Sequence, residues 1–414
     1  METVKQKLKI STSPTRQGDL VKGFKDKLGK EAEKAALIRE IARQTFEKYN
    51  FQEIETPIIE YEDFVKSGSD EGDEAISEIF RLKDKGDRNL ALRYEFTFQL
   101  KRVAKLQKLP FKRFQIGPVF RDEPVKGNRL RQFTQCDIDT IGAKIKDQAE
   151  LLSAMQDILN ALKVKSIIYI NNRKLLNEIL EEQGIKNKVE AIRELDKLDK
   201  LPLKEVKENL RNVGAEKLLE VVKQPESFFK KYKSYSEIEE LEKYCNYYGI
   251  KIKFQPTLAR GLSYYTGNVF EIKSNIKANE DISINSSEVR QIKESICGGG
   301  TYMVGDNIAS GISFSIERLM AVSNILIDIE KILIVSLNED KKAIEISKKL
   351  RKRGKNVSIF FGKPSKALDY ANSYGIKKVL FVGKKEVEQK KFKIKDMKTG
   401  KEVLVTIEKI KKGF

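Results

Sequence analysis

The segment that most constrains the fold is residues 120–139, Phe-Arg-Asp-Glu-Pro-Val-Lys-Gly-Asn-Arg-Leu-Arg-Gln-Phe-Thr-Gln-Cys-Asp-Ile-Asp, because both of its halves alternate like β-strands. Successive side chains of a strand point to opposite faces, which places Arg121 and Glu123 on one face of the first half. In the second half the same alternation groups three polar side chains: Gln135, Asp137 and Asp139. Residues 125–128, Val-Lys-Gly-Asn, predict the turn, since glycine and asparagine tolerate positive φ.

Such a hairpin carries groups that suit charged ligands. Arg121 can hold an anionic nucleotide and Phe133 can stack a base, while the carboxylates and amides can hold a cationic or polar amino acid. The charges alone would favour a salt-bridged surface hairpin without a ligand. The complete ordered string favours a nucleotide and amino-acid site.

Composition limits the class of protein. A chain of 414 residues with 40% hydrophobic residues can form two or three domains. No apolar run approaches the ~20 residues of a membrane span, and the first residues lack the apolar core of a signal peptide. The three cysteines, Cys136, Cys245 and Cys297, form no Cys-x-x-Cys pair that would predict zinc, and no disulfide framework. We therefore expect a cytoplasmic protein without a membrane partner.

The chain contains no histidine. The commonest general base and the commonest metal ligand are thereby absent, so chemistry must depend on carboxylates, arginines, backbone groups and bound ions. Phosphoanhydride chemistry with Mg²⁺ fits this limit, because it depends on positioning and charge stabilisation more than on a side-chain base.

Positive charge is concentrated near the C-terminus. Residues 331–414 contain 24 Lys and Arg against 9 Asp and Glu, a net charge of +15 out of +19 for the whole chain. This segment predicts a separate basic module that binds nucleic acid, with an acidic protein or a membrane surface as second choices. A generally lysine-rich proteome is the alternative explanation.

Several segments resemble the motifs of one enzyme family. Residues 120–139 resemble motif 2 of class II aminoacyl-tRNA synthetases, in the form found in histidyl-tRNA synthetases. The helix predicted over 31–50, followed by a strand over Phe51–Ile59, resembles motif 1, which forms the homodimer interface in that family. Pro57 by itself predicts only an edge or a bulge.

Two further segments carry the amino-acid side of the resemblance. Residues 89–103 predict a strand leading into a helix, and Glu95-Phe96-Thr97 between them matches the loop that holds the substrate α-amino group; helix capping is the alternative. Residues 260–267, Arg-Gly-Leu-Ser-Tyr-Tyr-Thr-Gly, resemble the histidine-specific signature. Arg260 would then neutralise the α-phosphate, and Tyr264 and Tyr265 would line the imidazole pocket. Without the resemblance, a core corner with a surface arginine would explain this segment.

The remaining signatures follow in order. Residues 297–303, Cys-Gly-Gly-Gly-Thr-Tyr-Met, resemble the second histidine signature, a glycine strand whose bare backbone lets a ligand approach. The family usually has Arg and Asp where this chain has Thr301 and Met303, and Asp where it has Ser263. Residues 311–320 resemble motif 3, whose Arg318 would contact the ATP γ-phosphate; an ordinary buried helix is the alternative.

The resemblance implies an α+β fold with an antiparallel catalytic sheet and flanking helices. The catalytic domain would occupy residues 1–164 and 246–326, interrupted by a helical insertion at 165–245 that leans on the tRNA acceptor arm. An α/β anticodon-binding domain would occupy 327–414. Its expected elements are strands at 332–336, 357–361 and 378–382, helices at 340–353 and 365–374, and a hairpin around 396–402.

The implied function is that of a homodimeric histidine–tRNA ligase, which converts ATP, L-histidine and tRNA(His) to histidyl-tRNA, AMP and diphosphate through histidyl-adenylate. Mg²⁺ would bridge the phosphates, and no protein metal site is expected. The catalytic residues would be Arg121, Arg260 and Arg318. ATP would be bound by Arg121, Glu123, Arg129, Phe133 and Arg318. Histidine would be bound by Glu95, Phe96, Thr97, Gln135, Asp139, Tyr264, Tyr265 and Tyr302.

Three other functions compete with this one. A catalytically impaired paralogue with a regulatory or RNA-binding role should lack the arginines and the basic module, which this chain keeps. A synthetase for threonine, proline or glycine should lack the Arg-Gly-Leu-x-Tyr-Tyr sequence. A pure RNA-binding protein would have no reason to keep an amino-acid pocket.

Overall fold

The computed structural model describes residues 20–67, 77–125, 130–199, 201–261, 264–274, 295–325, 327, 329–406 and 409. The chain divides into two compact units, residues 1–325 and 326–414. None of the helices in the described ranges is both long and apolar enough to cross a membrane.

The first unit is built on an eight-stranded sheet with the order β1-β5-β6-β11-β10-β9-β7-β8. Its strands are β1 (Gln52–Glu53), β5 (Phe111–Phe120), β6 (Gln132–Ile141), β7 (Ser166–Asn172), β8 (Ile252–Phe254), β9 (Asn268–Ser274), β10 (Ser295–Val304) and β11 (Asn307–Ser315). The two edge pairs, β1 with β5 and β7 with β8, are parallel, and the other pairs are antiparallel. The α+β fold with an antiparallel catalytic sheet is confirmed.

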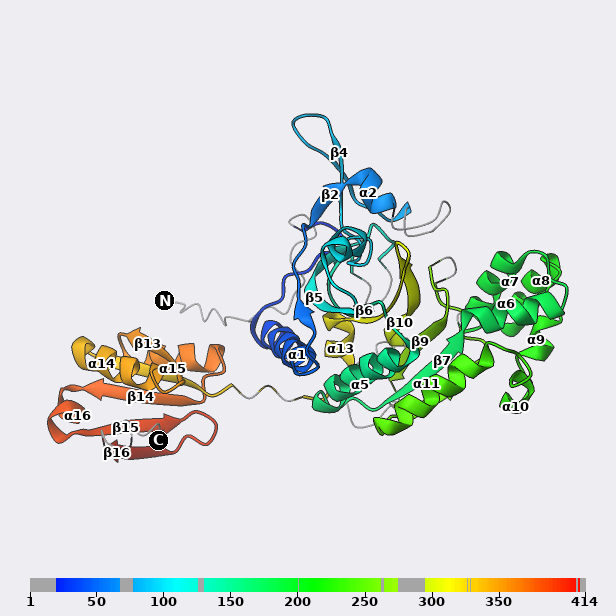
Figure 1. Ribbon diagram of the computed structural model, residues 1–414. Coiled ribbons are helices and arrows are strands. Elements are labelled where there is room, and N and C mark those ends of the chain that lie inside the picture. The colour runs from blue at the N-terminus through cyan, green and yellow to red at the C-terminus, as the bar shows by residue number, and fades with distance from the viewer. Residues whose placement is uncertain are drawn as a thin grey trace, which may run out of the picture. The chain divides into compact units, whose positions relative to one another are not determined.

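The two faces of this sheet differ in chemistry. Helices α1 (Gly29–Lys48), α5 (Ile145–Ala161), α11 (Tyr235–Tyr247) and α13 (Ile316–Val322) lie along one face (Figure 1). Apolar side chains such as Phe114 and Ile138 fill the space beneath these helices. Because side chains alternate along a strand, the neighbours Arg113, Asp137 and Asp139 are carried on the opposite face. That polar face holds the candidate site.

The helix predicted at 31–50 is α1, but a continuous strand over 51–59 is wrong. Strand β1 has two residues, and the chain then passes Pro57 into β2 (Ile59–Tyr61), which belongs to a different sheet. Proline has no amide hydrogen for a β-ladder, which explains the interruption. The second sheet has the order β2-β4-β3, with β3 (Arg81–Lys83) and β4 (Asn89–Leu92). Helix α2 (Glu62–Lys66) follows β2.

The predicted hairpin is β5 and β6, paired from Phe111 with Ile141 to Phe120 with Gln132. The prediction that Arg121 and Glu123 lie on a strand is wrong, because β5 ends at Phe120. Beyond it the Arg121 amide still donates to the Arg131 carbonyl oxygen at 2.8 Å. The Arg131 amide, however, donates to the Gly23 carbonyl oxygen at 2.8 Å and the Asp122 amide to the Glu78 carbonyl oxygen at 2.7 Å, so the ladder ends here. The turn predicted at 125–128 falls mostly outside the described residues, which resume at 130.

Residues 165–245 comprise β7, which is a strand of the large sheet, and a run of helices after it. These are α6 (Arg173–Glu182), α7 (Lys188–Leu195), α8 (Leu203–Asn212), α9 (Leu218–Val221), α10 (Glu226–Phe229) and α11. The predicted strand and helix at 89–103 are β4 and α4 (Leu100–Val103), and motif 3 is β11 running into α13.

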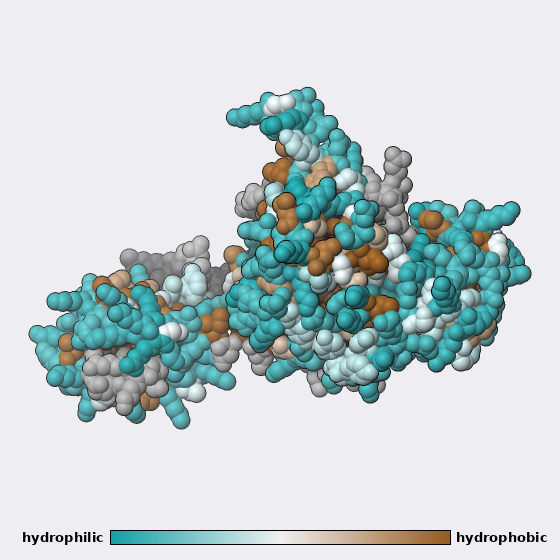
Figure 2. Space-filling model, in the orientation of Figure 1, coloured by the Kyte–Doolittle hydropathy of each residue, from teal (hydrophilic) through white to brown (hydrophobic). Residues whose placement is uncertain are grey.

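The second unit has a five-stranded sheet with the order β13-β12-β14-β15-β16. Its elements are β12 (Lys331–Leu337), α14 (Asp340–Arg351), β13 (Asn356–Phe361), α15 (Pro364–Ser373), β14 (Lys378–Gly383), α16 (Lys384–Gln389), β15 (Lys391–Asp396) and β16 (Glu402–Thr406). The expected α/β alternation and hairpin are confirmed, and α16 was missed. The face of this unit in Figure 2 is mostly hydrophilic, as its lysine content requires.

Candidate active site

A cavity of about 300 Å³ opens on the polar face of the large sheet. Segments far apart in the sequence line it: the loop after β5, strand β6, the segment around Arg260, strands β10 and β11, and the start of α13. Six of the predicted site residues lie in its wall: Arg121, Glu123, Phe133, Gln135, Arg260 and Arg318. Arg129, predicted to bind ATP, lies outside the described residues.

Two of the three arginines are held by backbone carbonyl groups. The Arg121 guanidinium lies 5.2 Å from the centre of the Phe133 ring, and its Nε donates to the Tyr94 carbonyl oxygen at 3.2 Å. Arg318 Nη1 donates to the Ser295 carbonyl oxygen at 2.6 Å. Ser315 caps α13 by accepting from the Arg318 amide, which fixes where this arginine leaves the helix. Both guanidinium groups are thus oriented before any ligand binds.

Arg260 is positioned by an acid and by a glycine. Its Nε donates to Glu271 Oε1 at 3.0 Å, and a Cβ atom at Gly298 would lie 2.1 Å from Arg260 Nη1. Likewise a Cβ atom at Gly300 would lie 2.8 Å from a ring carbon of Tyr265. The glycine strand was interpreted as making room for a ligand. In the structure it makes room for the protein's own Arg260 and Tyr265.

Asp139 anchors the deepest part of the site. Arg113 Nη2 lies 2.6 Å from Asp139 Oδ2, and the Tyr302 hydroxyl donates to Asp139 Oδ1. Gly311 on the neighbouring strand leaves space for this carboxylate, since a Cβ atom there would lie 1.8 Å from Asp139 Oδ1. Burial raises the pKa of Asp139 while the Arg113 charge lowers it. Arg113 and Asp139 therefore form a buried ion pair beneath the aromatic residues.

Three tyrosines form an aromatic wall at this depth. The Tyr264 and Tyr302 rings stack with centroids 4.8 Å apart, and Tyr264 meets Tyr265 edge-on at 5.1 Å. Burial raises the pKa of all three phenols above the ordinary value. Each hydroxyl therefore keeps its proton at neutral pH and can donate a hydrogen bond.

The predicted α-amino loop lies between β4 and α4. The Glu95 and Thr97 side chains hydrogen-bond to each other, and burial raises the pKa of Glu95 although Arg121 opposes this rise. Phe96 points away from solvent and is fully buried, with the Arg93 guanidinium 4.7 Å from its ring centre. The loop thus presents a carboxylate and a hydroxyl together.

The sequence prediction missed Arg113 and did not assign Asp137 to a ligand, and both are buried on the polar face. For Asp137 the signal was present, because alternation on β6 already placed it between Gln135 and Asp139. No sequence pattern around Arg113 indicated that it belongs to the site. It pairs with Asp139 across the β5–β6 ladder, a contact that only strand register defines.

The departures from the family pattern fall mostly away from the cavity. The Thr301 hydroxyl lies on the helix-covered face, where it accepts from Gln148 Nε2 at 3.0 Å and meets Ser310 Oγ at 3.1 Å. Met303 is 40% exposed and does not line the cavity. Ser263 lies outside the described residues.

An antiparallel sheet whose polar face gathers three arginines and an aromatic-acidic pocket from these ordered motifs defines a class II aminoacyl-tRNA synthetase. The profile described as Histidyl-tRNA synthetase matches residues 23–319, and the profile described as Anticodon binding domain matches residues 331–414. The chain belongs to the histidyl-tRNA synthetase family.

Known proteins resemble the chain over nearly its whole length. Histidine–tRNA ligase 1 of Bacillus cereus is 32% identical over 430 aligned positions, which cover 94% of this chain and 96% of the relative. The histidine–tRNA ligase of Wolinella succinogenes is 33% identical over 438 positions, covering 91% and 93%. The crystal structure of histidyl-tRNA synthetase from Nostoc sp. PCC 7120 matches with a TM-score of 0.80 at 25% identity, covering 97% of this chain and 100% of that one.

Proposed function

We propose that the protein charges tRNA(His) with histidine in two steps on this site. The family assignment makes it an ATP-using histidine–tRNA ligase with histidine and tRNA(His) as its other substrates. The histidine carboxylate attacks the ATP α-phosphate and diphosphate leaves. A ribose hydroxyl at the tRNA 3′ end then attacks the acyl carbon and AMP leaves. The observation that carries the proposal is the convergence of Arg121, Arg260 and Arg318 on one cavity.

The arginines would stabilise the phosphate charge that develops during adenylation. Arg121 and Arg260 are assigned to the α-phosphate and Arg318 to the γ-phosphate. Preorganised donors of this kind lower the barrier because they need no reorientation during the reaction. Glu123 and Phe133 are assigned to the adenosine, as is Arg129.

Histidine would lie deeper, against the aromatic and acidic residues. Glu95 and Thr97 are assigned to the α-ammonium group, since a carboxylate and a hydroxyl both accept hydrogen bonds from it. The remaining histidine-binding assignments are Phe96, Gln135, Asp139, Tyr264, Tyr265 and Tyr302. For Phe96, whose ring is buried, the backbone is the part available to a ligand.

Mg²⁺ would enter together with ATP. It commonly binds through one or two carboxylates plus substrate phosphates, and Glu123 and Glu317 are the carboxylates in the cavity wall. Among the residues that the structure describes, no group of three or more His, Cys, Asp or Glu side chains could hold a metal ion. A Mg²⁺ ion that arrives bound to the ATP phosphates would need no more protein ligands than these two carboxylates. When bound, it would neutralise phosphate charge.

We also propose a homodimer built on the motif 1 region. Three large apolar side chains on and beside β2 are unusually exposed: Ile58 at 40%, Ile59 at 50% and Tyr61 at 57%. Figure 2 shows hydrophobic residues gathered on this part of the first unit. Sedimentation equilibrium tests the assembly, and an Ile59→Glu variant should shift it toward monomer.

The domain limits and the cellular location stay proposals. The limits are a catalytic domain at 1–164 and 246–326, a helical insertion at 165–245 and an anticodon-binding domain at 327–414. The insertion so defined includes β7, a strand of the catalytic sheet, so its helices begin at α6. A cytoplasmic location is expected from the sequence.

ATP–pyrophosphate exchange measured with each amino acid in turn tests the proposed activity. Histidine should support exchange, and threonine, proline and glycine should not. Exchange with another amino acid in place of histidine would contradict the substrate assignment. The absence of exchange with every amino acid would favour the regulatory paralogue, a kind of protein whose fold this chain shares: an ATP phosphoribosyltransferase regulatory subunit/histidyl-tRNA synthetase of Bacillus halodurans C matches with a TM-score of 0.72 at 20% identity.

A further inference from the structure

One buried acid of the site, Asp137, has an oxygen without a partner. Asp137 is 5% exposed, and its Oδ2 accepts from Gln135 Nε2 at 3.0 Å. Its Oδ1 has no hydrogen-bond partner within the described part of the chain. Buried polar atoms are nearly always hydrogen-bonded, so an unpaired one at a functional site points to a missing ligand.

The position of Asp137 on β6 places it where a ligand would reach it. Gln135, two residues earlier on the same face, lines the cavity. Asp139, two residues later, meets the Tyr302 hydroxyl beneath the aromatic wall. Asp137 is therefore carried between the nucleotide end and the aromatic end of the site. The Tyr264 hydroxyl, at the aromatic end, is another of the buried atoms without a hydrogen-bond partner among the described residues.

The neighbouring cation is already engaged by another acid. Arg113 is fully buried and places its Nη2 2.6 Å from Asp139 Oδ2, while its Nε and Nη1 have no hydrogen-bond partner among the described residues. The cluster of Arg113, Asp137 and Asp139 thus holds more acids than bases. It has capacity for a basic, hydrogen-bonding group, and an imidazole ring has this chemistry.

We propose that Asp137 binds the imidazole ring of the substrate through its unpartnered oxygen and thereby helps to select histidine. This inference rests on the proposed function and adds a specificity residue to it. Gln135 holds the other carboxyl oxygen, so the unpartnered oxygen is the one that turns to the ring.

The surroundings determine which partner donates the proton. Burial raises the pKa of Asp137 to about 8; Arg113 lowers it, whereas Asp139 and Glu95 raise it. Other ionisable groups within electrostatic reach are Arg93 and Tyr265. At pH 7 the Asp137 carboxyl therefore keeps its proton and donates it to the unprotonated ring nitrogen. As the pH rises above 8 this donor is lost, and affinity for histidine falls.

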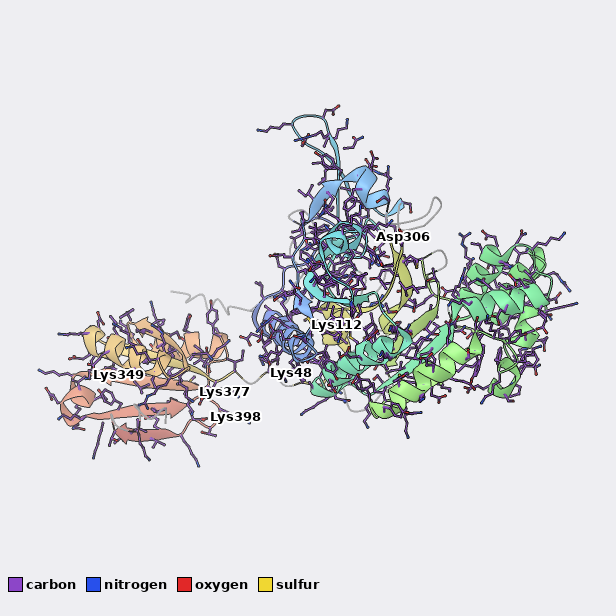
Figure 3. All side chains as sticks on the ribbon, viewed as in Figure 1. Lys48, Lys112, Asp306, Lys349, Lys377 and Lys398 are labelled. Carbon is purple, nitrogen blue, oxygen red and sulfur yellow. The ribbon has the colours of Figure 1, made fainter. Side chains whose placement is uncertain are left out.

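Three variants test the proposal through the KM values of ATP–pyrophosphate exchange. Asp137→Ala should raise the KM for histidine by about 10- to 100-fold at pH 7, because the ring loses a buried partner. The KM for ATP should stay within about twofold. The matched control is Asp306→Ala, an exposed acid at the β10–β11 turn (Figure 3), which should change neither value.

Asp137→Asn keeps a donor but cannot titrate. Its KM for histidine at pH 7 should stay within about threefold of wild type. The decline of kcat/KM for histidine above pH 8 should be shallower in this variant than in wild type. The substrate α-amino group titrates equally with both proteins, so the difference between the two profiles isolates Asp137.

An unchanged KM for histidine in a folded Asp137→Ala protein would overturn the proposal and leave the unpartnered oxygen to water. An Asp137→Asn profile as steep as the wild-type profile would overturn it as well, including when the alanine variant fails to fold. Wild-type protein without histidine-dependent exchange would instead contradict the proposed function, so the two failures are distinguishable.

Discussion

At the scale of single residues, the glycines of β10 decide where the Arg260 and Tyr265 side chains lie. Gly298 faces Arg260 and Gly300 faces Tyr265. A Cβ atom at either glycine would lie too close to the side chain that faces it. An alanine at Gly298 must therefore displace the guanidinium, which is also tied to Glu271. The glycines act through the arginine and the tyrosine that they admit.

This arrangement predicts that Gly298→Ala and Arg260→Ala have similar effects. Each should slow histidine-dependent exchange by about 10²- to 10³-fold, since removing one charge-stabilising donor costs about 3–4 kcal/mol in the barrier. Affinity for tRNA should be largely kept, because the excess of positive charge lies in residues 331–414. Gly86→Ala is the control, since its Cβ atom would meet only an ordinary contact at 3.4 Å. Near wild-type exchange in Arg260→Ala would refute the role of Arg260, and near wild-type exchange in Gly298→Ala alone would refute the positioning role of this glycine.

The limits of sequence reasoning are also visible in particular residues. Alternation on β6 predicted the shared face of Gln135 and Asp139, because period-two patterning is local. The same logic failed for Arg121 and Glu123, because the Arg131 amide donates to Gly23 and the Asp122 amide donates to Glu78, which ends the strand. The partners in these bonds are far apart in the sequence, so a local alternation pattern cannot predict them.

At the scale of elements, a chain of buried amides joins the catalytic sheet to the helices that follow β7. Gln148 of α5 donates to Thr301 of β10 and accepts from Asn268 of β9 at 2.8 Å. Asn268 in turn accepts from Asn172, also at 2.8 Å, and Asn172 caps α6 by accepting from the Lys174 amide. Thr301, where the family usually has arginine, is one end of this chain.

Removing the middle amide of this hydrogen-bonded series should therefore lower the free energy of unfolding and leave catalysis largely unchanged. Asn268→Ala leaves both Gln148 and Asn172 short of a partner in a buried place, and we expect unfolding in urea to become easier by about 1–3 kcal/mol. The KM for histidine should change little, because these amides lie on the helix-covered face. Gln156→Ala, which removes an exposed hydrogen bond to Asn160 on α5, is the control. Equal urea midpoints for the two variants would show that the buried chain contributes no stability.

At the scale of the whole molecule, the two units differ in charge, since most of the net positive charge lies in the second unit. The first unit has its own core and all of the described cavity. The second unit has separate cores and a surface dense in long side chains, among them Lys349, Lys377 and Lys398 (Figure 3). We therefore expect substrate activation and the main electrostatic attraction for RNA to belong to different parts of the chain.

Deleting residues 331–414 should then weaken tRNA binding and flatten its dependence on salt. Each lost phosphate contact removes about one unit from the slope of log K against log salt concentration. Histidine-dependent exchange should survive, because the cavity is lined only by the first unit. Filter binding at several salt concentrations measures both quantities. Unchanged affinity and slope in the truncated protein would place the RNA surface in the first unit.

The absence of histidine from the entire chain fixes one feature of its pH dependence. No protein imidazole can act as a base, so the profile of kcat should show no transition from an enzyme histidine near pH ~6.5 once the imidazole of the substrate is accounted for. Raised pKa values of Glu95 and Asp137 place the expected transitions on other groups. A transition near 6.5 that persists in both Glu95→Gln and Asp137→Asn would contradict this expectation.

The most direct test of the central claim is the charging of a tRNA(His) transcript with labelled histidine by the purified full-length protein. We predict acid-precipitable histidyl-tRNA that requires ATP, forms together with one AMP per molecule charged, and is lost in the Arg260→Ala variant. A protein that binds tRNA(His) but forms no histidyl-tRNA under these conditions would contradict the account.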